Sequence, residues 1–261
     1  MADPLFSFDD QVVLVTGGSR GIGRAIAQGF GERGATVVLS ARTVDEVEKA
    51  CREMETGGAK VASFVCDVSS RSSIETLFEN VVKEFGRIDT LVNSAGVNKR
   101  MPAIDYTEDE YDTILGINLK GAFLQAQVVG RHMIERKSGS QIHVGSLQGD
   151  RPMSNLVPYA TRKAGIEQMV RALAVEWGKT GVRINNLAPG FVTTDLTRKL
   201  WEDETLNAWG RDNIAMGHTA TPEDMVGTAL FLASKASAYF TGQTMYVDGG
   251  FSAGRFWPFP C

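Results

Sequence analysis

Short apolar runs alternate with longer stretches of helical periodicity along most of the chain. The apolar runs are rich in β-branched residues and cover residues 12–15, 36–40, 61–66, 88–92, 141–145, 183–188 and 244–247. Runs of this kind are typical of parallel strands that are buried on both faces. The intervening segments repeat their apolar residues at helical spacing. Strands and helices that alternate with short links predict an α/β fold, with a single-domain, doubly wound parallel sheet of about seven strands flanked by helices.

A glycine-rich turn joins the first predicted strand to the first predicted helix. Its residues include Gly17, Ser19, Arg20, Gly21, Ile22 and Gly23. A helix N-terminus offers free N–H groups and a positive dipole end to a phosphate, and glycine lets the backbone approach closely. The turn therefore predicts a dinucleotide-binding loop, although its Gly-x-x-x-Gly-x-Gly spacing departs from Gly-x-Gly-x-x-Gly. The alternative is a glycine-rich turn without a ligand.

The end of the second predicted strand indicates which dinucleotide is preferred. Many dinucleotide-binding folds place an acidic residue here, where it binds the ribose 2′-hydroxyl. This chain has Ser40 and Arg42 at that point and no acid. Arg42, with Arg20 from the glycine-rich turn, is suited to pair with a 2′-phosphate. The sequence thus favours NADP(H), with NAD(H) as the other cofactor, while a solvated surface charge is the alternative reading of Arg42.

Other candidate cofactor contacts also follow predicted strands. Asp67 and Val68 follow the third strand, where Asp67 either reaches the adenine or caps the next helix. The small residues after the fourth strand leave room for a flat cofactor, and the chain there contains Asn93, Ala95 and Gly96. A further turn follows the sixth strand and contains Pro189, Gly190, Val192 and Thr194. Ligands of doubly wound sheets bind at the carboxyl ends of the strands, so all these residues are expected at one edge.

A serine, a tyrosine and a lysine supply candidate chemistry at the same edge. Ser146 follows the fifth strand, and Tyr159 and Lys163 are four residues apart, which places both on one face of a helix. That helix is expected to begin near Tyr159, because Pro158 disfavours a helical residue before it. An ammonium beside a phenol favours the ionised phenol, which can then act as an acid or base near neutral pH. The alternative is an ordinary aromatic and a charge that share a helix face.

Two polar residues lie inside apolar segments. Asn118 begins a long predicted helix that extends to about residue 136, and such a residue is usually a cap or a polar core residue. His143 lies within the fifth predicted strand, where packing is a better explanation than catalysis. Neither residue identifies a site by its sequence context alone.

Composition excludes several classes of function. The chain has 261 residues, a net charge of −4 and three cysteines, which favours neither nucleic-acid binding nor a disulfide framework, and no metal site is expected. The N-terminus does not resemble a secretory signal, no apolar run is long enough for a membrane span, and a cytoplasmic protein is expected. Residues 194–218 are predicted to form a substrate lid. The aromatic tail at 251–261 is predicted to pack on another subunit.

Taken together, these motifs resemble those of the short-chain dehydrogenase/reductase family over nearly the whole chain, from about residue 8 to residue 250. The resemblance rests on Gly17, Gly21 and Gly23, Asp67, Asn93 with Ala95 and Gly96, Asn118, Ser146, Tyr159 with Lys163, and Pro189 to Thr194. It implies a Rossmann-type, NAD(P)-dependent oxidoreductase acting on CH–OH groups, assembled as a homotetramer. Tyr159 would be the general acid/base. Lys163 would assist Tyr159 and hold the nicotinamide ribose, and Ser146 would orient the substrate oxygen. Asn118 would sustain a water relay, and Val192 and Thr194 would contact the nicotinamide carboxamide.

The substrate is less clearly indicated. Further stretches are similar to the gluconate 5-dehydrogenase-like sugar-acid and polyol dehydrogenases of the family. Arg100 follows the fourth strand, where it could bind a carboxylate, and Gln148 could reach sugar hydroxyls; a surface charge or subunit contact is an equal reading of Arg100. A 3-oxoacyl-(acyl-carrier-protein) reductase and a broad-range ketone reductase are alternatives. A non-catalytic dinucleotide sensor is a further one, disfavoured because Tyr159 and Lys163 are both present.

Overall fold

Residues 4–254 are described by the computed structural model, and within them seven strands form one sheet. The strands are β1 (Val12–Thr16), β2 (Thr36–Ala41), β3 (Lys60–Val65), β4 (Thr90–Asn93), β5 (Gly139–Val144), β6 (Val182–Pro189) and β7 (Thr244–Val247). They are all parallel, in the order β3-β2-β1-β4-β5-β6-β7. The strand order therefore reverses between β1 and β4, which confirms the predicted doubly wound sheet.

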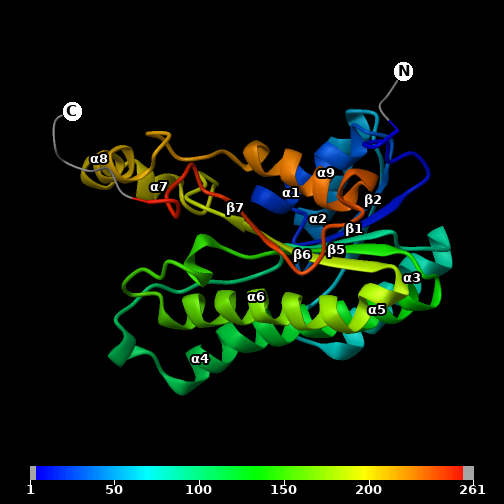
Figure 1. Cartoon of the computed structure of the whole chain (residues 1–261), viewed down its shortest axis with the longest axis horizontal. Coiled ribbons are helices and arrows are strands. Elements are labelled where there is room, and N and C mark those ends of the chain that lie inside the picture. The colour runs from blue at the N-terminus through cyan, green and yellow to red at the C-terminus, as the bar shows by residue number, and fades with distance from the viewer. Residues whose placement is uncertain (1–3, 255–261) are drawn as a thin grey trace.

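Helices cover both faces of this sheet (Figure 1). One face packs against α1 (Gly21–Gly31), α2 (Val44–Thr56) and α9 (Val226–Ala233), and the other against α3 (Arg71–Phe85), α5 (Gly121–Glu135) and α6 (Val157–Trp177). α4 (Glu108–Leu115) packs against α6.

Every residue of β1 is buried, which explains its uninterrupted apolar run. Val13 and Val15 belong to the core under α1 and α9, whereas Val12 and Leu14 belong to the core under α3 and α5. Successive side chains of a strand point to opposite faces, so both faces must be apolar when helices cover both.

The register of the sheet brings the ends of several strands level with one another. Thr16 at the end of β1 pairs with Ser40 on one side and with Asn93 on the other, and Asn93 pairs with His143 on β5. The loops that follow β1, β2, β4 and β5 therefore leave the sheet along one edge. This edge carries the candidate site.

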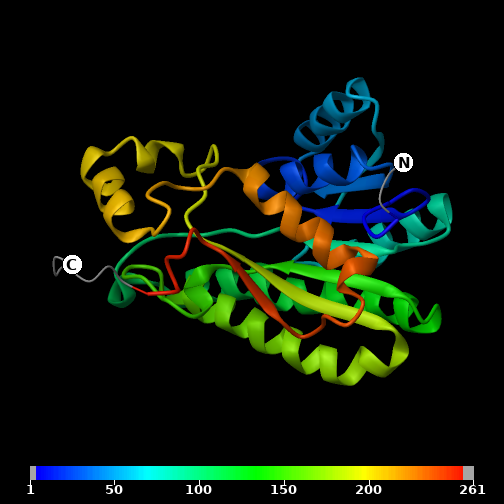
Figure 2. The same ribbon diagram turned by 45° about the horizontal axis from the view of Figure 1, so that its top comes forward.

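The segment after β6 forms two short helices beyond the carboxyl edge of the sheet. These are α7 (Arg198–Trp201) and α8 (Glu204–Asn213), and Figure 2 shows them, in yellow, apart from the helices that cover the sheet. The Phe191 ring packs edge-on against Trp201, Trp209 and Phe251 at centroid distances of 5.5, 5.6 and 5.0 Å. The predicted lid therefore corresponds to a helical excursion anchored by aromatic packing. Of the predicted aromatic tail, residues 255–261 lie outside the described residues.

Two helix boundaries differ from those expected. The chain is already helical before Asn118, because α4 leads through the π-helical turn Gly116–Lys120 directly into α5. Asn118 is thus an interior residue of a helical path and does not begin one. α6 begins at Val157, before Tyr159, with Pro158 in its first turn. Proline is tolerated there, because its missing N–H is one that the helix leaves unpaired.

Candidate active site

A large cavity lies at the carboxyl edge of the sheet, with a volume of about 1010 Å³. This volume is at the upper end of the range for small-molecule and cofactor sites. Most of the predicted site residues line it, namely Gly17, Ser19, Arg20, Gly21, Ile22, Ser40, Arg42, Val68, Ala95, Gly96, Arg100, Ser146, Gln148, Tyr159, Lys163, Pro189, Gly190, Val192 and Thr194. Four predicted residues do not line it, namely Gly23, Asp67, Asn93 and Asn118.

The glycine-rich turn is packed so closely that side chains would not fit. Gly17 has a φ of +72°, and a Cβ added to it would lie 2.7 Å from the Ala95 backbone nitrogen. A Cβ on Gly23 would lie 2.4 Å from the Gly17 carbonyl oxygen. Gly17 therefore brings the turn against the loop after β4, and Gly23 brings α1 against the turn. Gly21, the first residue of α1, lines the cavity, so the start of α1 faces it, as phosphate binding requires.

The far end of the cavity is cationic and contains an unpartnered polar atom. Arg20 and Arg42 line this end, and the Ser40 hydroxyl is buried there with no hydrogen-bond partner among residues 4–254. Glu46 in the first turn of α2 also lines the cavity, and its carboxylate lies 3.8 Å from the Arg20 guanidinium. Glu46 is not among the predicted site residues, because a glutamate in the first turn of a helix is common and does not by itself indicate a ligand. The residues fit an anionic group such as a 2′-phosphate.

Asp67 and Asn93 use their side chains for local structure. The Asp67 carboxylate accepts hydrogen bonds from the Ser69 backbone N–H at 2.9 Å and from the Ser69 hydroxyl at 2.7 Å, and these bonds lower the pKa of Asp67. Asn93 is buried, with its side-chain nitrogen 3.4 Å from His143 Nδ1. The expected helix cap is wrong for Asp67, because Ser70 caps α3 and the Asp67 carboxylate instead holds the turn before that helix. The neighbouring Cys66 and Val68 line the cavity instead.

Asn118 holds the loop that follows β4. Its Oδ1 accepts a hydrogen bond from the Val97 N–H, and its Nδ2 donates one to the Val97 carbonyl, both at 2.8 Å. Both ends of the buried amide are thus used on one backbone residue. The water relay from Asn118 to Lys163 stays a prediction. The π-helical turn around it is a feature often found at functional sites.

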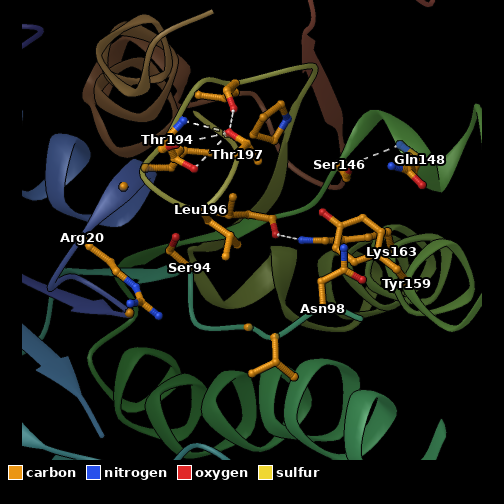
Figure 3. Close-up of a pocket in the computed structure, with 18 of the residues that line it drawn as sticks. Arg20, Ser94, Asn98, Ser146, Gln148, Tyr159, Lys163, Thr194, Leu196 and Thr197 are labelled. Atoms are coloured by element: carbon orange, nitrogen blue, oxygen red, sulfur yellow. Dashed lines mark hydrogen bonds between the residues drawn. The ribbon is translucent and has the colours of Figure 1, made fainter. Parts of the chain in front are cut away.

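The structure brings Ser146, Tyr159 and Lys163 to the wall of the same cavity. Figure 3 shows Tyr159 and Lys163 on one helix and Ser146 on the neighbouring turn. Lys163 is buried, donates a hydrogen bond to the Val144 carbonyl at 2.6 Å, and has its Nζ 5.5 Å from the centroid of the Tyr159 ring. The Ser146 hydroxyl accepts a hydrogen bond from the Gln148 N–H at 3.2 Å. Its own proton remains available for a ligand oxygen.

Burial dominates the electrostatics of this wall. Burial, reinforced by the positive charge of Arg162, lowers the pKa of Lys163 well below its ordinary value. Burial, followed by the charge of Lys163, also lowers the pKa of His143 to about 4. His143 is therefore neutral near pH 7 and lies within β5, as expected for a packed residue. Lys163 gives up a proton more readily than a surface lysine does.

Comparison with known proteins identifies the family. Residues 17–252 match a family model described as enoyl-(acyl carrier protein) reductase. The chain is also 33% identical over 246 residues to the 5-keto-D-gluconate 5-reductase of Escherichia coli, an alignment that covers 94% of this chain and 97% of that protein. The chain belongs to the short-chain dehydrogenase/reductase family. It is accordingly an oxidoreductase that acts on CH–OH groups.

Two further similarities concern other members of the family. The chain is 36% identical over 242 residues to the 3-oxoacyl-[acyl-carrier-protein] reductase of Thermotoga maritima, covering 93% of this chain and 98% of that protein. It superposes with a TM-score of 0.93 on the crystal structure of a gluconate 5-dehydrogenase from Burkholderia cenocepacia in complex with NADP and tartrate. That structure shares 32% sequence identity, and the match covers 96% of this chain and 98% of that one.

The substrate side of this short-chain dehydrogenase/reductase carries many apolar side chains beside polar ones such as Ser154, Asp195, Thr197, Asp203 and Thr205. Gln148 and Arg100 line the cavity, but the surrounding wall is built from Leu147, Met153, Leu156, Phe191, Leu196, Leu200, Trp201, Leu206 and Trp209. α7 and α8 supply several of these side chains. The polar groups predicted for substrate binding therefore face a wall that also accommodates carbon chains or the apolar face of a sugar.

The sequence analysis also missed Arg162. This arginine lies between Tyr159 and Lys163 on α6, lines the cavity and is buried. Its position immediately before a lysine suggests an ordinary surface charge, so no signal in a single sequence would have identified it.

Neither a metal site nor a membrane span is evident within residues 4–254. Their His, Cys, Asp and Glu residues form no group of three or more that could hold a metal ion. No helix in this range combines the length and apolar character required to cross a bilayer.

Proposed function

We propose that this short-chain dehydrogenase/reductase uses NADP(H) to interconvert a secondary alcohol and a ketone in a sugar acid or polyol. The observation that carries this proposal is the convergence on one cavity of the glycine-rich turn, Ser146, Tyr159 and Lys163. A phosphate-binding turn and a proton-transfer group are the two parts that such a reaction requires.

NADP(H) is the proposed cofactor, with NAD(H) as the weaker alternative. Arg20, Arg42 and the unpartnered Ser40 hydroxyl suit a 2′-phosphate, and the gluconate 5-dehydrogenase of similar fold has NADP bound. By family resemblance, Asn93, Gly96, Val192 and Thr194 contact the ribose and the nicotinamide. When bound, the cofactor supplies or accepts the hydride.

The remaining chemistry falls to the side chains around the reacting carbon. Ser146 donates a hydrogen bond to the substrate oxygen, which orients it toward Tyr159. In ketone reduction, the Tyr159 hydroxyl protonates the oxygen that gains negative charge. In alcohol oxidation, the phenolate removes the hydroxyl proton. Lys163, held by the Val144 carbonyl, stabilises that phenolate, and Asn118 keeps the adjoining loop in place.

A sugar acid or polyol is the proposed substrate class. Its support is the identity to 5-keto-D-gluconate 5-reductase together with Arg100 and Gln148 on the cavity wall. Arg100 would bind the carboxylate, and the Gln148 amide would hydrogen-bond to a hydroxyl. The apolar wall would pack against the C–H face of the carbon chain.

The same apolar wall favours a second candidate, a ketone with a carbon-rich substituent. Trp201, Trp209 and Phe191 would pack against an acyl or alkyl chain better than against hydroxyl groups. The identity to a 3-oxoacyl-[acyl-carrier-protein] reductase gives this candidate independent support. A 3-oxoacyl thioester or a simple ketone would then replace the sugar acid.

A substrate panel tests these proposals directly. Keto-sugar acids, ketoses, 3-oxoacyl thioesters and simple ketones are assayed by cofactor absorbance, with NADPH and NADH in parallel. Turnover of a keto-sugar acid with NADPH is expected, and Tyr159→Phe should abolish it. Preference for a thioester or an alkyl ketone would move the assignment to the second candidate. Tight NADPH binding without any turnover would instead indicate a dinucleotide sensor.

The proposed assembly is a homotetramer in the cytoplasm. Apolar side chains exposed on the outer helices support a subunit interface, including Tyr111 on α4, Phe123 on α5 and Val175 on α6. The unpaired thiols of Cys51 and Cys66 agree with a reducing compartment. Light scattering coupled to size-exclusion chromatography measures the assembly, and a mass near that of one chain would refute it.

A further inference from the structure

Arg162 is a buried cation for which the described residues supply no acidic partner. Its side chain is only 4% exposed, and among residues 4–254 no carboxylate forms an ion pair with it. Its Nε is buried without a hydrogen-bond partner. Buried charges are ordinarily paired, because an isolated charge loses its hydration. The position of this guanidinium therefore needs an explanation.

The guanidinium lies against the ring of Tyr159. Its central carbon is 4.4 Å from the ring centroid, closer than the Lys163 Nζ at 5.5 Å. On the other side it packs against Gly96, where an added Cβ would lie 3.1 Å from one Arg162 terminal nitrogen. The absence of a side chain at Gly96 thus leaves room for the guanidinium. Tyr159 has two cations beside it, one from each of two successive helix positions.

The pKa values of Arg162 and Lys163 depend on burial and on neighbouring charges. Burial lowers the pKa of Arg162 to about 10, and interaction with Tyr159 opposes that effect. Arg162 in turn contributes to the lowered pKa of Lys163. Two cations that repel each other in a buried site are stabilised by an anion between them. Tyr159, whose ring lies beside both cations, is a group that can supply that anion.

Within residues 4–254, the other charged groups around α6 form no ion pair with Arg162. His143 on β5 is neutral because burial lowers its pKa to about 4, and Glu110 on α4 is bound by Lys99. Arg100 lines the cavity as a further cation. The remaining charged groups on elements near α6 form no ion pair with Arg162 and include Asp109, Asp112, Lys120, Asp150, Glu167 and Arg183. Tyr159 is the group whose charge and hydrogen bond raise the pKa of Arg162 against the effect of burial.

We propose that Arg162 is a positioning residue that stabilises the phenolate form of Tyr159 and so extends base catalysis by the enzyme to lower pH. This inference rests on the proposed function, in which Tyr159 is the acid/base. In alcohol oxidation the hydroxyl proton of the substrate passes to the phenolate oxygen, and the hydride on the same carbon passes to NADP⁺, which leaves a ketone. Arg162 takes no part in either transfer. It acts through the charge that it places beside the ring.

The test is the pH profile of kcat/KM for alcohol oxidation. Arg162→Met keeps the side-chain stem and removes the charge, while Arg162→Lys keeps the charge. An opposite charge within about 4–6 Å shifts a titration by about 1–3 units. Lys163 stays beside the ring when the Arg162 charge is removed, which places the expectation in the lower part of that range. Arg162→Met should move the acidic limb of the profile upward by about 1–2 pH units. Arg162→Lys should restore most of the wild-type profile.

Arg171→Met is the matched control. Arg171 is exposed on the same helix and donates a hydrogen bond to Gln168. Its loss should leave the pH profile unchanged. Circular dichroism and NADPH binding report whether each variant folds. Should Arg162→Met fail to fold, Arg162→Gln removes the charge while keeping a polar group. Equal profiles for wild type and a folded charge-removing variant would overturn the proposal.

A second readout separates this inference from the proposed function. The ultraviolet difference absorbance of tyrosinate is titrated in each protein, with Tyr159→Phe subtracted to isolate one tyrosine. Removing the Arg162 charge should move that titration upward by about 1–2 pH units even without a substrate. Wild-type protein that turns over nothing in the panel would refute the proposed function alone. A tyrosinate titration that ignores Arg162 would refute the inference alone.

Discussion

Arg42→Ala is the sharpest test of how the cavity selects its cofactor. Arg42 immediately follows β2 and lines the cavity beside the buried, unpartnered Ser40 hydroxyl. Hydrogen bonds from Ser69 are the largest causes of the lowered pKa of Asp67, and Arg42 is only the last cause. Within residues 4–254 no carboxylate forms an ion pair with Arg42. The Arg42 charge is therefore largely free to bind a 2′-phosphate. NADH lacks that phosphate, so only NADPH should be affected.

The size of the effect follows from the exposure of the site. A hydrogen bond that involves a charged group contributes about 1.5–3 kcal/mol. Arg42 is exposed, so solvent and salt screen it, and about 1–2 kcal/mol is a suitable expectation. This corresponds to a loss of roughly 5–30-fold in kcat/KM for NADPH relative to NADH. Arg20→Ala should cost less, because the Arg20 side chain is 70% exposed and shares its charge with Glu46 at 3.8 Å.

The assay compares kcat/KM for NADPH and NADH with one substrate at one ionic strength. Fluorescence titration of both cofactors gives the same ratio when no substrate is turned over. Arg52→Ala, which removes an exposed i,i+4 ion pair with Glu48 on α2, is the control and should leave the ratio unchanged. Glu46→Gln should raise NADPH affinity a few-fold by releasing Arg20. A ratio that changes less than twofold in Arg42→Ala, or an equal loss with NADH, would show that Arg42 does not bind the phosphate.

Three other substitutions test the supports of the site. Asn118→Ala removes both hydrogen bonds to Val97, so it should lower the unfolding free energy by about 1–3 kcal/mol and weaken NADPH binding. Asn118→Asp keeps only the acceptor and should have an intermediate effect. Unchanged melting and NADPH binding would contradict this role of Asn118. Gly17→Ala forces a Cβ toward the Ala95 nitrogen at a φ of +72°, so a loss of at least about 1 kcal/mol and of cofactor affinity is expected, measured by thermal melting and titration. The pKa of His143 is lowered to about 4 in the folded protein, so the unfolded chain binds a proton there more readily. The free energy of unfolding should therefore fall as the pH drops from about 6.5 to 4, by up to about 3 kcal/mol. Urea unfolding at pH 7 and 4.5 should therefore show a smaller acid loss in His143→Gln, and an equal loss would contradict it.

Periodicity and strand-end chemistry were sufficient to predict the sheet. β-branched runs that are buried on both faces allow few placements, and the short links between strands and helices impose parallel order. Helix boundaries were less predictable. The π-helical turn that joins α4 to α5 leaves the apolar spacing nearly unchanged, so the pattern suggested a new helix at Asn118. The first turn of α6 illustrates a second difficulty, because a proline at the start of a helix and one just before it produce almost the same local sequence.

Within the site, the sequence predicted residues that follow strands, but it did not predict residues whose positions depend on contacts between distant segments. Ser146 and Gly17 follow strands, and topology brings such positions together. Glu46 reaches the cavity because the first turn of α2 passes Arg20, a contact that depends on how the two helices pack. Arg162 is buried only because Gly96 leaves space opposite it. Asn118 differs again, since its type and position were noticed but its hydrogen bonds to Val97 are fixed by the loop after β4.

The charge of the cavity is opposite to the charge of the chain, which limits what composition can say about ligands. The whole chain carries −4, whereas the cavity is lined by three acids and five cations, the latter being Arg20, Arg42, Arg100, Arg162 and Lys163. A low-dielectric cavity focuses the field of the charges within it, so an anionic ligand at its mouth responds to the local excess of positive charge. A net negative charge therefore does not disfavour NADP(H) or a sugar acid. An acyl-carrier protein would remain outside the cavity, so its binding would depend on the charge of the surface around the mouth.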